Sequence, residues 1–430
     1  MQSSCTSPVD NELLSAEQRE RIQRLKIMIL VFAAIMLNYI DRQVIALLKP
    51  MLQSHFGWTN LSYSYMTMAY QLAAAFAFLG SGWLIDRVGL KRGFALGVGV
   101  WSAAGMLQAA ASTVAGFMGS LGVLGAAEAI GTPAQVKTAA TYFPVKDRSM
   151  MIGIGNMASN CGAIVAPLVI VPLALWLGWR APFLIAGGLG YVWILFWLRV
   201  RHPREVEDAS ADREASPISW LAMIGDRRQW AVIVAKCFSD NVWWFLLFFI
   251  PDLLHRSFGL PEHALAMRVS AAYVLAALGS LYGGWLPSVL LRRGWSVNRS
   301  RKTSLLVFAL LITIVPLALL FHTSWVAAAI LGVALFAHQG FSTNVFGMSA
   351  DLFPAQVVGT AVGIGAFAGN LSGMVMLWAA GWSLDHGHGY APLLFVCAGS
   401  YLVAFLLLNL FVPRIESSGK SSFYSQAIVH

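Results

Sequence analysis

Long apolar segments are the feature that most restricts how this chain of 430 residues can fold. They lie near residues 25–52, 61–86, 92–112, 114–142, 147–177, 181–199, 228–254, 264–292, 302–322, 324–352, 357–384 and 390–412. A helix needs about 20 largely apolar residues to cross a bilayer, and each segment is long enough for one crossing. The sequence therefore predicts an all-α membrane protein with twelve transmembrane helices in two six-helix halves.

The composition agrees with a membrane protein and argues against a soluble one. Only 11% of the residues are charged, whereas a soluble domain carries about 25%. The four cysteines, at positions 5, 161, 237 and 397, have no motif spacing, so we expect neither a disulfide nor a metal framework. The polar N-terminal stretch up to Lys26 is unlike the short basic start of a cleaved signal peptide. No cofactor is expected.

A polar stretch over residues 201–217 separates the sixth apolar segment from the seventh. It suggests a cytoplasmic tail over 1–24, a first half over 25–199, a linker over 200–227, a second half over 228–413 and a second tail over 414–430. The loops on the side of the linker carry 22 of the 29 Lys and Arg residues. By the positive-inside rule, both termini are then cytoplasmic. No soluble domain carries the positive charge, so nucleic acid is not an expected partner.

Charged residues inside the apolar segments are the strongest functional signal. Asp41 and Arg42 interrupt the first segment and Glu128 lies about halfway along the fourth. A charge at mid-bilayer costs roughly 2.5–3.5 kcal/mol even on lenient scales, so such residues are paired or face a watery cavity. Arg42 has a planar fork suited to a carboxylate, and a buried carboxyl group such as Glu128 can hold and release a proton. The alternative is a set of structural ion pairs.

The loop after the second segment carries a motif that returns in part in the second half. It reads Gly-Trp-Leu-Ile-Asp-Arg-Val-Gly over residues 82–89, and Gly-Gly-Trp-Leu followed by basic residues begins at 283. Glycine allows two helices to approach closely, and an aspartate at a helix end can pair with an arginine or a facing helix N-terminus. We therefore expect a conformational latch made of Gly82, Asp86, Arg87 and Gly89. A solvated basic loop is the alternative.

This loop resembles the signature of the major facilitator superfamily. Four further segments resemble its anion:cation symporters, hexuronate carriers in particular: Asn-Tyr-Ile-Asp-Arg at 38–42, Glu-Ala-x-x-x-Pro at 128–133, Asp-x-x-Trp-Trp-Phe at 240–245 and Ala-His-Gln-Gly-Phe-Ser-x-Asn at 337–344. The resemblance covers residues 25–413. It implies that Arg42 anchors an anion and that Asp41 and Glu128 take part in proton coupling. Relatives often carry an arginine about two turns before the glutamate, where this chain has Ser120, so coupling is expected to differ in detail.

Other polar or aromatic residues within the segments are candidates for the lining of a central site. Lys137 falls nearly opposite Glu128 on an ideal helix, so snorkelling to the surface is its alternative role, unless Pro133 kinks the helix. Lys236 can form an i, i+4 bridge with Asp240. The remaining candidates for substrate binding are Tyr70, Gln71, Asn156, Trp243, His338, Gln339, Asn344 and Asn370. His386 and His388 lack a third ligand, so we do not expect a metal site.

Together these features predict a monomeric secondary transporter in a bacterial inner membrane. The expected activity is symport of a proton with a small organic anion, a hexuronate such as glucuronate or galacturonate. Another sugar acid or monocarboxylate (galactonate, glucarate, an aromatic acid) and export of a metabolite by proton antiport are the alternatives. A membrane-embedded enzyme should show a nucleophile with its base, and a sensor should carry a signalling domain, neither of which is found in the sequence.

Overall fold

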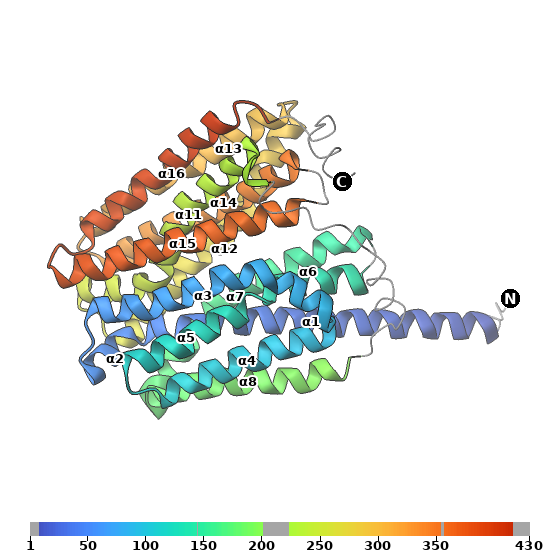
Figure 1. The fold of residues 1–430 in the computed structure, drawn as a ribbon, viewed down its shortest axis with the longest axis horizontal. Coiled ribbons are helices and arrows are strands. Elements are labelled where there is room, and N and C mark those ends of the chain that lie inside the picture. The colour runs from blue at the N-terminus through green and yellow to red at the C-terminus, as the bar shows by residue number, and fades with distance from the viewer. Residues whose placement is uncertain (1–7, 144, 201–222, 354–356, 416–430) are drawn as a thin grey trace, which may run out of the picture.

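The computed structural model is an elongated bundle of helices, and it describes residues 8–143, 145–200, 223–353 and 357–415 (Figure 1). Twelve helical stretches in these ranges are long and apolar enough to cross a membrane. No strand is present in the described part of the chain. The predicted fold class and the number of crossings are therefore confirmed, and the protein is an integral multi-pass membrane protein.

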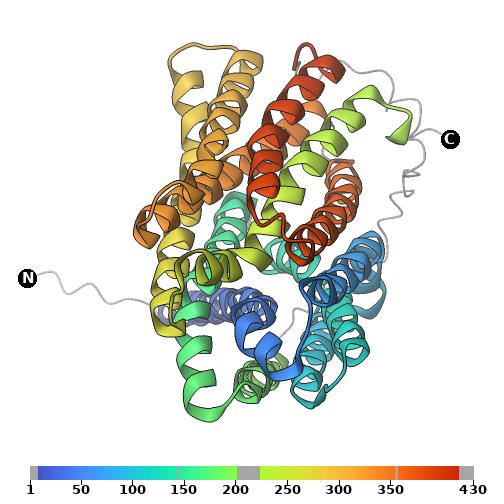
Figure 2. The same ribbon diagram turned by 90° about the vertical axis from the view of Figure 1, so that its left-hand side faces the viewer.

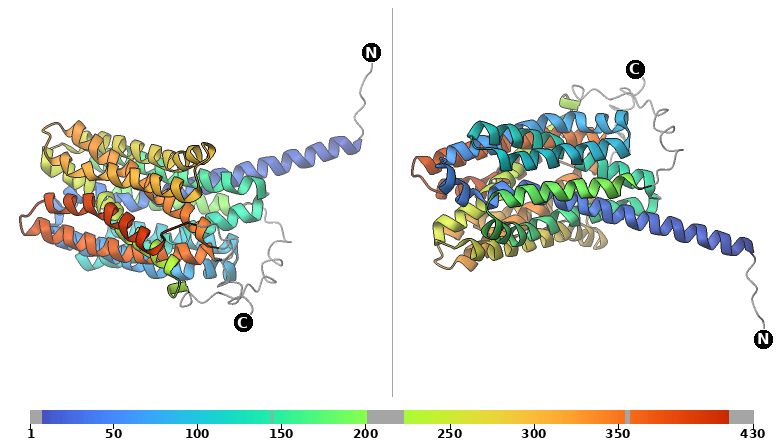
Figure 3. Two further views of the ribbon diagram at one scale, coloured as in Figure 1. Left: turned by 90° about the horizontal axis from the view of Figure 1, so that it is seen from above. Right: turned by 90° about the horizontal axis from the view of Figure 1, so that it is seen from below.

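In the described residues, the first half of the chain forms eight helices. Their bounds are α1 (Pro8–Leu47), α2 (Lys49–Phe56), α3 (Asn60–Val88), α4 (Leu90–Ala110), α5 (Val114–Glu128), α6 (Gly131–Tyr142), α7 (Val145–Leu177) and α8 (Arg180–Leu198). The helix α1 begins well inside the stretch predicted as a tail, and its membrane-spanning part is Arg21–Leu47. Figure 3 shows its N-terminal end projecting from the bundle.

The second half has α11 (Arg227–Phe258), α12 (Glu262–Arg292), α13 (Val297–Leu311), the 3₁₀ helix η1 (Ile312–Leu319), α14 (Ser324–Leu352), α15 (Val358–Asp385) and α16 (Ala391–Phe411). Most of the predicted linker lies outside the described residues. The two halves meet where α3 packs along α15 and α7 packs along α12, while α1 touches α11 between them. Figure 2, along the bundle axis, shows the two groups of helices side by side.

Prolines interrupt three of the membrane crossings. Pro133 cannot donate to the carbonyl of Ala129, and the fourth crossing breaks between α5 and α6 at this point. Pro50 in the first turn of α2 and Pro316 within η1 accompany the breaks in the first and ninth crossings. A proline removes one backbone hydrogen bond and clashes with the preceding turn. Ala129 and Ile130 keep right-handed helical φ and ψ, so the kink predicted from Pro133 is a local interruption within one crossing, with Glu128 at the last residue of α5.

Candidate functional site

An ion pair between α1 and α5 forms the centre of the candidate site. Nε and Nη2 of Arg42 lie 3.1 and 3.0 Å from Oε2 of Glu128. Nη2 also donates to Oδ1 of Asn38 at 3.1 Å, and Tyr70 of α3 donates its hydroxyl to the same Glu128 oxygen. Side-chain exposure is 11% for Arg42 and 1% for Glu128. Arg42 thus bonds to Glu128 rather than to its neighbour Asp41.

Glycines on α5 and α7 bring these side chains together. A Cβ on Gly125, three residues before Glu128, would stand 2.4 Å from the carbonyl oxygen of Tyr70. A Cβ on Gly162 would lie 2.6 Å from the carbonyl oxygen of Met36. Close approach of helix backbones in a membrane depends on such small residues. The close packing of α5 on α3 therefore brings Glu128 next to Tyr70, and the close packing of α7 on α1 positions the segment that carries Arg42.

Two carboxylate oxygens at this centre have no hydrogen-bond partner among the described residues. They are Oδ2 of Asp41 and Oε1 of Glu128, and both are buried. Asp41 faces α4, where its Oδ1 lies 4.0 Å from the place a Cβ on Gly105 would occupy. An ionised carboxylate left unpaired in an apolar interior is costly. Both oxygens can therefore accept a proton without breaking an existing contact.

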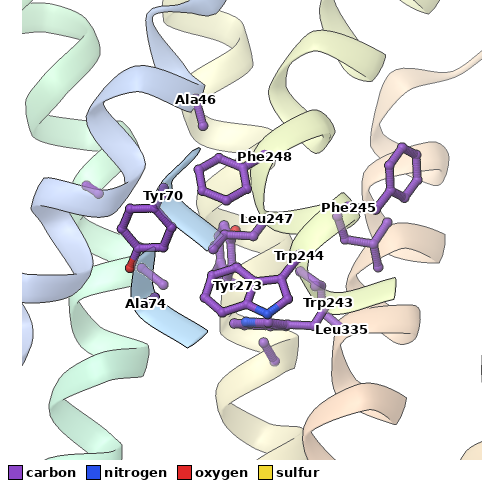
Figure 4. Packing of buried hydrophobic residues seen from close by; sticks show 14 of the residues in the cluster. Ala46, Tyr70, Ala74, Trp243, Trp244, Phe245, Leu247, Phe248, Tyr273 and Leu335 are labelled. Atoms are coloured by element: carbon purple, nitrogen blue, oxygen red, sulfur yellow. The ribbon is translucent and has the colours of Figure 1, made fainter. Parts of the chain in front are cut away.

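Aromatic rings surround the Arg42 guanidinium on both sides of the interface. Its Cζ lies 4.8 Å from the centroid of Tyr39, 5.6 Å from that of Tyr70 and 5.3 Å from that of Trp244. Trp244 belongs to α11, so this contact joins the two halves. Figure 4 shows Tyr70 beside Phe248 and Trp244, with ring centroids 6.0 and 6.1 Å away.

The second half contributes a lysine–aspartate pair on α11. Nζ of Lys236 lies 2.8 Å from Oδ1 of Asp240, and Ser239 donates to the same oxygen at 3.3 Å. The side chains are 9% and 10% exposed. The centroid of the Phe346 ring lies 5.0 Å from the ammonium nitrogen. This pair matches the i, i+4 bridge predicted from the sequence.

A row of glycines on α15 packs against the face of α11 that carries the lysine–aspartate pair. Gly365, Gly369 and Gly373 are spaced by four residues, as are Lys236, Asp240 and Trp244. A Cβ on these glycines would stand 3.2 Å from Lys236 Cγ, 2.3 Å from Asp240 Oδ2 and 2.5 Å from Trp244 Cδ1, respectively. This row was not predicted from the sequence, although its spacing of four is visible in the chain.

Adding one methyl group to the row should destabilise the protein. We expect Gly369→Ala to cost about 1–3 kcal/mol by overpacking, because Asp240 must leave its position beside Lys236. Gly363→Ala on the same helix is the matched control, since no described atom lies within 4 Å of its Cβ position. Thermal unfolding in detergent should show a lower Tm for Gly369→Ala only. Equal Tm values for the two variants would contradict the packing account.

Trp243 and His338 form a layer behind the lysine–aspartate pair. Their rings stack with centroids 4.6 Å apart, and Nδ1 of His338 lies 2.6 Å from the hydroxyl of Tyr401. Tyr401 also donates to the carbonyl of Ser239 at 3.2 Å. These contacts orient the turn of α11 that carries Asp240. The geometry therefore favours Trp244 over Trp243 as the ring that meets a ligand next to Arg42, and ligand contact by Trp243 or His338 stays a prediction.

The other polar residues predicted on α14 and α15 differ in their surroundings. Gln339 accepts a hydrogen bond from Ser280 at 3.4 Å, and Ser280 lies 3.5 Å from Nδ2 of Asn160 across the interface. Asn344 donates to the carbonyls of Gly283 and Gly340, both at 2.9 Å, which is a helix-packing arrangement. Asn370 donates to Ala366, and its buried Oδ1 has no partner among the described residues. Their roles toward a ligand stay predictions.

Three further predicted residues lie on α3, α6 and α7. Gln71 is fully buried, and neither its Oε1 nor its Nε2 has a hydrogen-bond partner in the described part of the chain. Lys137 donates to the carbonyl of Ile85 at 3.3 Å, near the loop at the end of α3. This direction fits the snorkelling alternative. The side chain of Asn156 lies outside the described set.

The predicted latch is described only in part. Gly89 has a φ of 85°, a left-handed value that favours glycine, and its N–H donates to Ile85 at the end of α3. Arg87 packs its guanidinium 5.3 Å from the Trp83 centroid. The side chain of Asp86 lies outside the described set. No described atom lies within 4 Å of a Cβ position on Gly82, so the close helix approach expected there is not found among the described residues, whereas Gly283 does contact Gly340 of α14.

Relatives of known activity match the chain along most of its length. A hexuronate transporter of Escherichia coli K12 is 28% identical over 88% of this chain and 91% of its own. A D-galactonate transporter of Escherichia coli O6:H1 is 24% identical over 91% and 96%. A galacturonate transporter of Dickeya chrysanthemi is 28% identical over 70% and 92%. These relatives are membrane transporters of small sugar acids.

Solved structures share the fold. A D-xylose-proton symporter superimposes with a TM-score of 0.75 at 16% identity, covering 92% of this chain and 99% of that one. A bacterial homologue of the lysosomal transporter Spinster, in an inward-facing and occupied conformation, gives a TM-score of 0.71 at 19% identity, with 94% and 96% covered. The family model of the Major Facilitator Superfamily matches residues 31–295. The twelve crossings and this match together show that the chain belongs to the Major Facilitator Superfamily.

Proposed function

We propose that the protein carries a sugar acid with one carboxylate, such as glucuronate or galacturonate, across the membrane together with a proton. The observation that carries the proposal is the Arg42–Glu128 pair. One oxygen of Glu128 contacts two nitrogens of the Arg42 guanidinium, Nε and Nη2. The names of the relatives supply the class of substrate. The positive charge on the side of the termini supports an orientation with both termini in the cytoplasm of a bacterial cell.

The pair suggests how proton and substrate are coupled. Arg42 cannot present its Nε and Nη2 to Glu128 and to a substrate carboxylate at the same time. Protonation of Glu128 removes the negative charge that holds the guanidinium, and the fork then becomes available for a bidentate bond to the substrate. The unpartnered Oε1 of Glu128 is a place for this proton. Asp41, next to Arg42 on α1, is a second candidate proton site.

The charge balance of the site favours a substrate with a single carboxylate. Glu128 neutralises Arg42, and Asp240 neutralises Lys236. Protonation of Glu128 frees one cation, which matches one carboxylate. A dicarboxylate would also need Lys236 released from Asp240, to which it lies 2.8 Å away.

Uptake into proteoliposomes tests the proposal directly. With an inward proton gradient, labelled glucuronate should accumulate, and unlabelled galacturonate should compete. Galactonate and glucarate test the other sugar acids, and lactate and benzoate test simple monocarboxylates. If no labelled sugar acid accumulates while labelled lactate or benzoate does, the substrate class is wrong and only the carriage of an organic anion survives.

Neutral side chains on α14 and α15 should set the preference for a hydroxylated acid. We expect Gln339→Ala and Asn370→Ala to raise the KM for a uronate about 5- to 150-fold, the equivalent of a lost buried hydrogen bond of about 1–3 kcal/mol. Ser342→Ala is a control on α14. Uptake assays at a fixed proton gradient measure the change. An unchanged KM in both variants would place sugar recognition elsewhere.

A further inference from the structure

A second charged cluster closes the end of the interface farthest from the chain termini. It consists of Lys49 on α2, Asp252 and Arg256 on α11, and Tyr390 just before α16. The side chain of Lys49 is 0% exposed and that of Asp252 is 1% exposed. We call these four residues the distal cluster, and the proposed orientation places it on the outer side of the membrane.

One oxygen of Asp252 receives contacts from both halves. Its Oδ2 lies 2.9 Å from Nζ of Lys49, in the first half, and 2.9 Å from Nε of Arg256, in the second. The hydroxyl of Tyr390, also in the second half, donates to the same oxygen. Two of the three partners therefore move with Asp252 if the halves separate, and Lys49 does not.

Further bonds across the interface show that this end is closed. Nη2 of Arg256 donates to Gln53 at 3.0 Å and to Asn60 at 2.7 Å. Asp385 of α15 accepts from the backbone N–H groups of Asn60 and Leu61, at 2.9 and 2.8 Å, at the start of α3. A carrier that alternates between two sides must break all of these contacts to admit a substrate here.

The surroundings of Lys49 leave it poorly satisfied once the halves part. In the closed state, its Nζ lies 4.4 Å from the ring centroid of Phe249 and 4.8 Å from that of Tyr63. Asp252 lies against Nζ at 2.9 Å, and Nζ has no other acceptor among the described residues. Separation removes Asp252 and Phe249 and leaves the ammonium with the Tyr63 ring. Asp252, in contrast, keeps Arg256 and Tyr390.

Lys49 also lies in line with the candidate substrate anchor. It follows Arg42 by seven residues. Although α1 ends at Leu47, both cations face α11, Arg42 beside the ring of Trp244 and Lys49 beside the ring of Phe249. An anion that Lys49 attracts from the outer side is therefore held on the same face of the first half as Arg42, the face that contacts α11.

We propose that Lys49 is an entry site for the carboxylate of the incoming substrate, and that Asp252 takes its place on Lys49 when the outer end closes. The inference rests on the proposed function, because it assumes an anionic substrate that arrives from this side. Lys49 then has two alternating partners, the substrate in the open state and Asp252 in the closed state. The first speeds capture by electrostatic attraction, and the second seals the path behind the substrate.

Two single substitutions separate an entry site from a simple gate. Lys49→Met and Asp252→Asn both abolish the ion pair, but only Lys49→Met removes the cation. Opening can be followed with a cysteine at Ala46, which is 1% exposed in the closed state, in a chain whose natural cysteines are replaced by alanine. An impermeant maleimide added outside should label this cysteine several-fold faster in both variants than in the parent.

The KM for uptake from outside then distinguishes the two roles. Lys49→Met should raise the KM at least about 10-fold, the equivalent of a lost charge-assisted hydrogen bond. Asp252→Asn should leave the KM unchanged or lower it, because the cation remains and the outer end opens more readily. Equal changes in KM with equal labelling would overturn the entry site and leave only a gate.

A third variant guards against poor folding of Asp252→Asn. Arg256→Gln removes the bonds to Gln53 and Asn60 but keeps Lys49, so it too should speed labelling without raising the KM. A raised KM equal to that of Lys49→Met contradicts the proposal.

The proposed function is judged on the wild-type protein alone, by whether a sugar acid accumulates. The Lys49 inference is judged on the ratio between variants, with whichever acid the wild type takes up, so the two can fail separately.

Discussion

Arg42→Ala is expected to abolish accumulation of the sugar acid while the protein still inserts into the membrane. The guanidinium offers two charge-assisted hydrogen bonds to one carboxylate, each worth about 1.5–3 kcal/mol. Their loss corresponds to a fall in kcat/KM of at least about 100-fold. Removal of Arg42 also leaves Glu128 buried with Tyr70 as its one remaining partner among the described residues. Initial uptake rates in proteoliposomes with matched protein content measure the effect.

Arg42→Lys should rescue little of this activity. A lysine keeps the charge but is a point donor, and it cannot reproduce the planar fork that meets Glu128 through Nε and Nη2. Normal melting temperature and yield of both variants would show that the fold is intact. Uptake by Arg42→Ala within a few-fold of wild type would rule out the arginine as the anchor.

Glu128→Gln is expected to abolish accumulation driven by a proton gradient. Glutamine imitates the protonated acid and cannot release a proton, so the coupling step is lost. Arg42 is then free of its carboxylate partner, and binding of the substrate should persist. The prediction is therefore a split result: no uphill uptake, but continued exchange of external for internal labelled substrate at equal pH on both sides.

The control for this split is Asp41→Asn, which neutralises the other buried carboxylate in the site. If Glu128→Gln still concentrates the sugar acid as the wild type does and Asp41→Asn does not, the proton rides on Asp41. Loss of both accumulation and exchange in Glu128→Gln would instead mean that the carboxylate holds the binding site together. In that case the pair with Arg42 is structural.

The membrane crossings were predictable from the sequence because hydropathy over about 20 residues is a local property. The charged positions were predictable for the same reason, since Asp41, Arg42 and Glu128 stand out against apolar neighbours. Their partners were not, because Arg42 and Glu128 are 86 residues apart. Which of them pair depends on how α1, α3 and α5 pack.

The sequence also could not predict which of two neighbouring residues on a helix faces the site. Trp243 and Trp244 are adjacent and differ by about 100° around an ideal helix, so the choice between them depends on the rotation of α11. That rotation follows from the glycine row on α15, whose spacing shows a flat surface but not which helix lies on it. Asn344 illustrates the same limit, since a polar residue at mid-membrane can hold two helices together as well as bind a ligand.

The most direct test is to follow substrate and proton in the same vesicles. Wild-type proteoliposomes contain a trapped pH dye, start with equal pH on both sides, and receive an inward gradient of glucuronate with the membrane potential clamped. The account predicts that labelled glucuronate enters and that the lumen acidifies at the same time, with the acidification absent in Glu128→Gln. Entry of glucuronate without acidification of the lumen would contradict the coupling of substrate and proton at the Arg42–Glu128 pair.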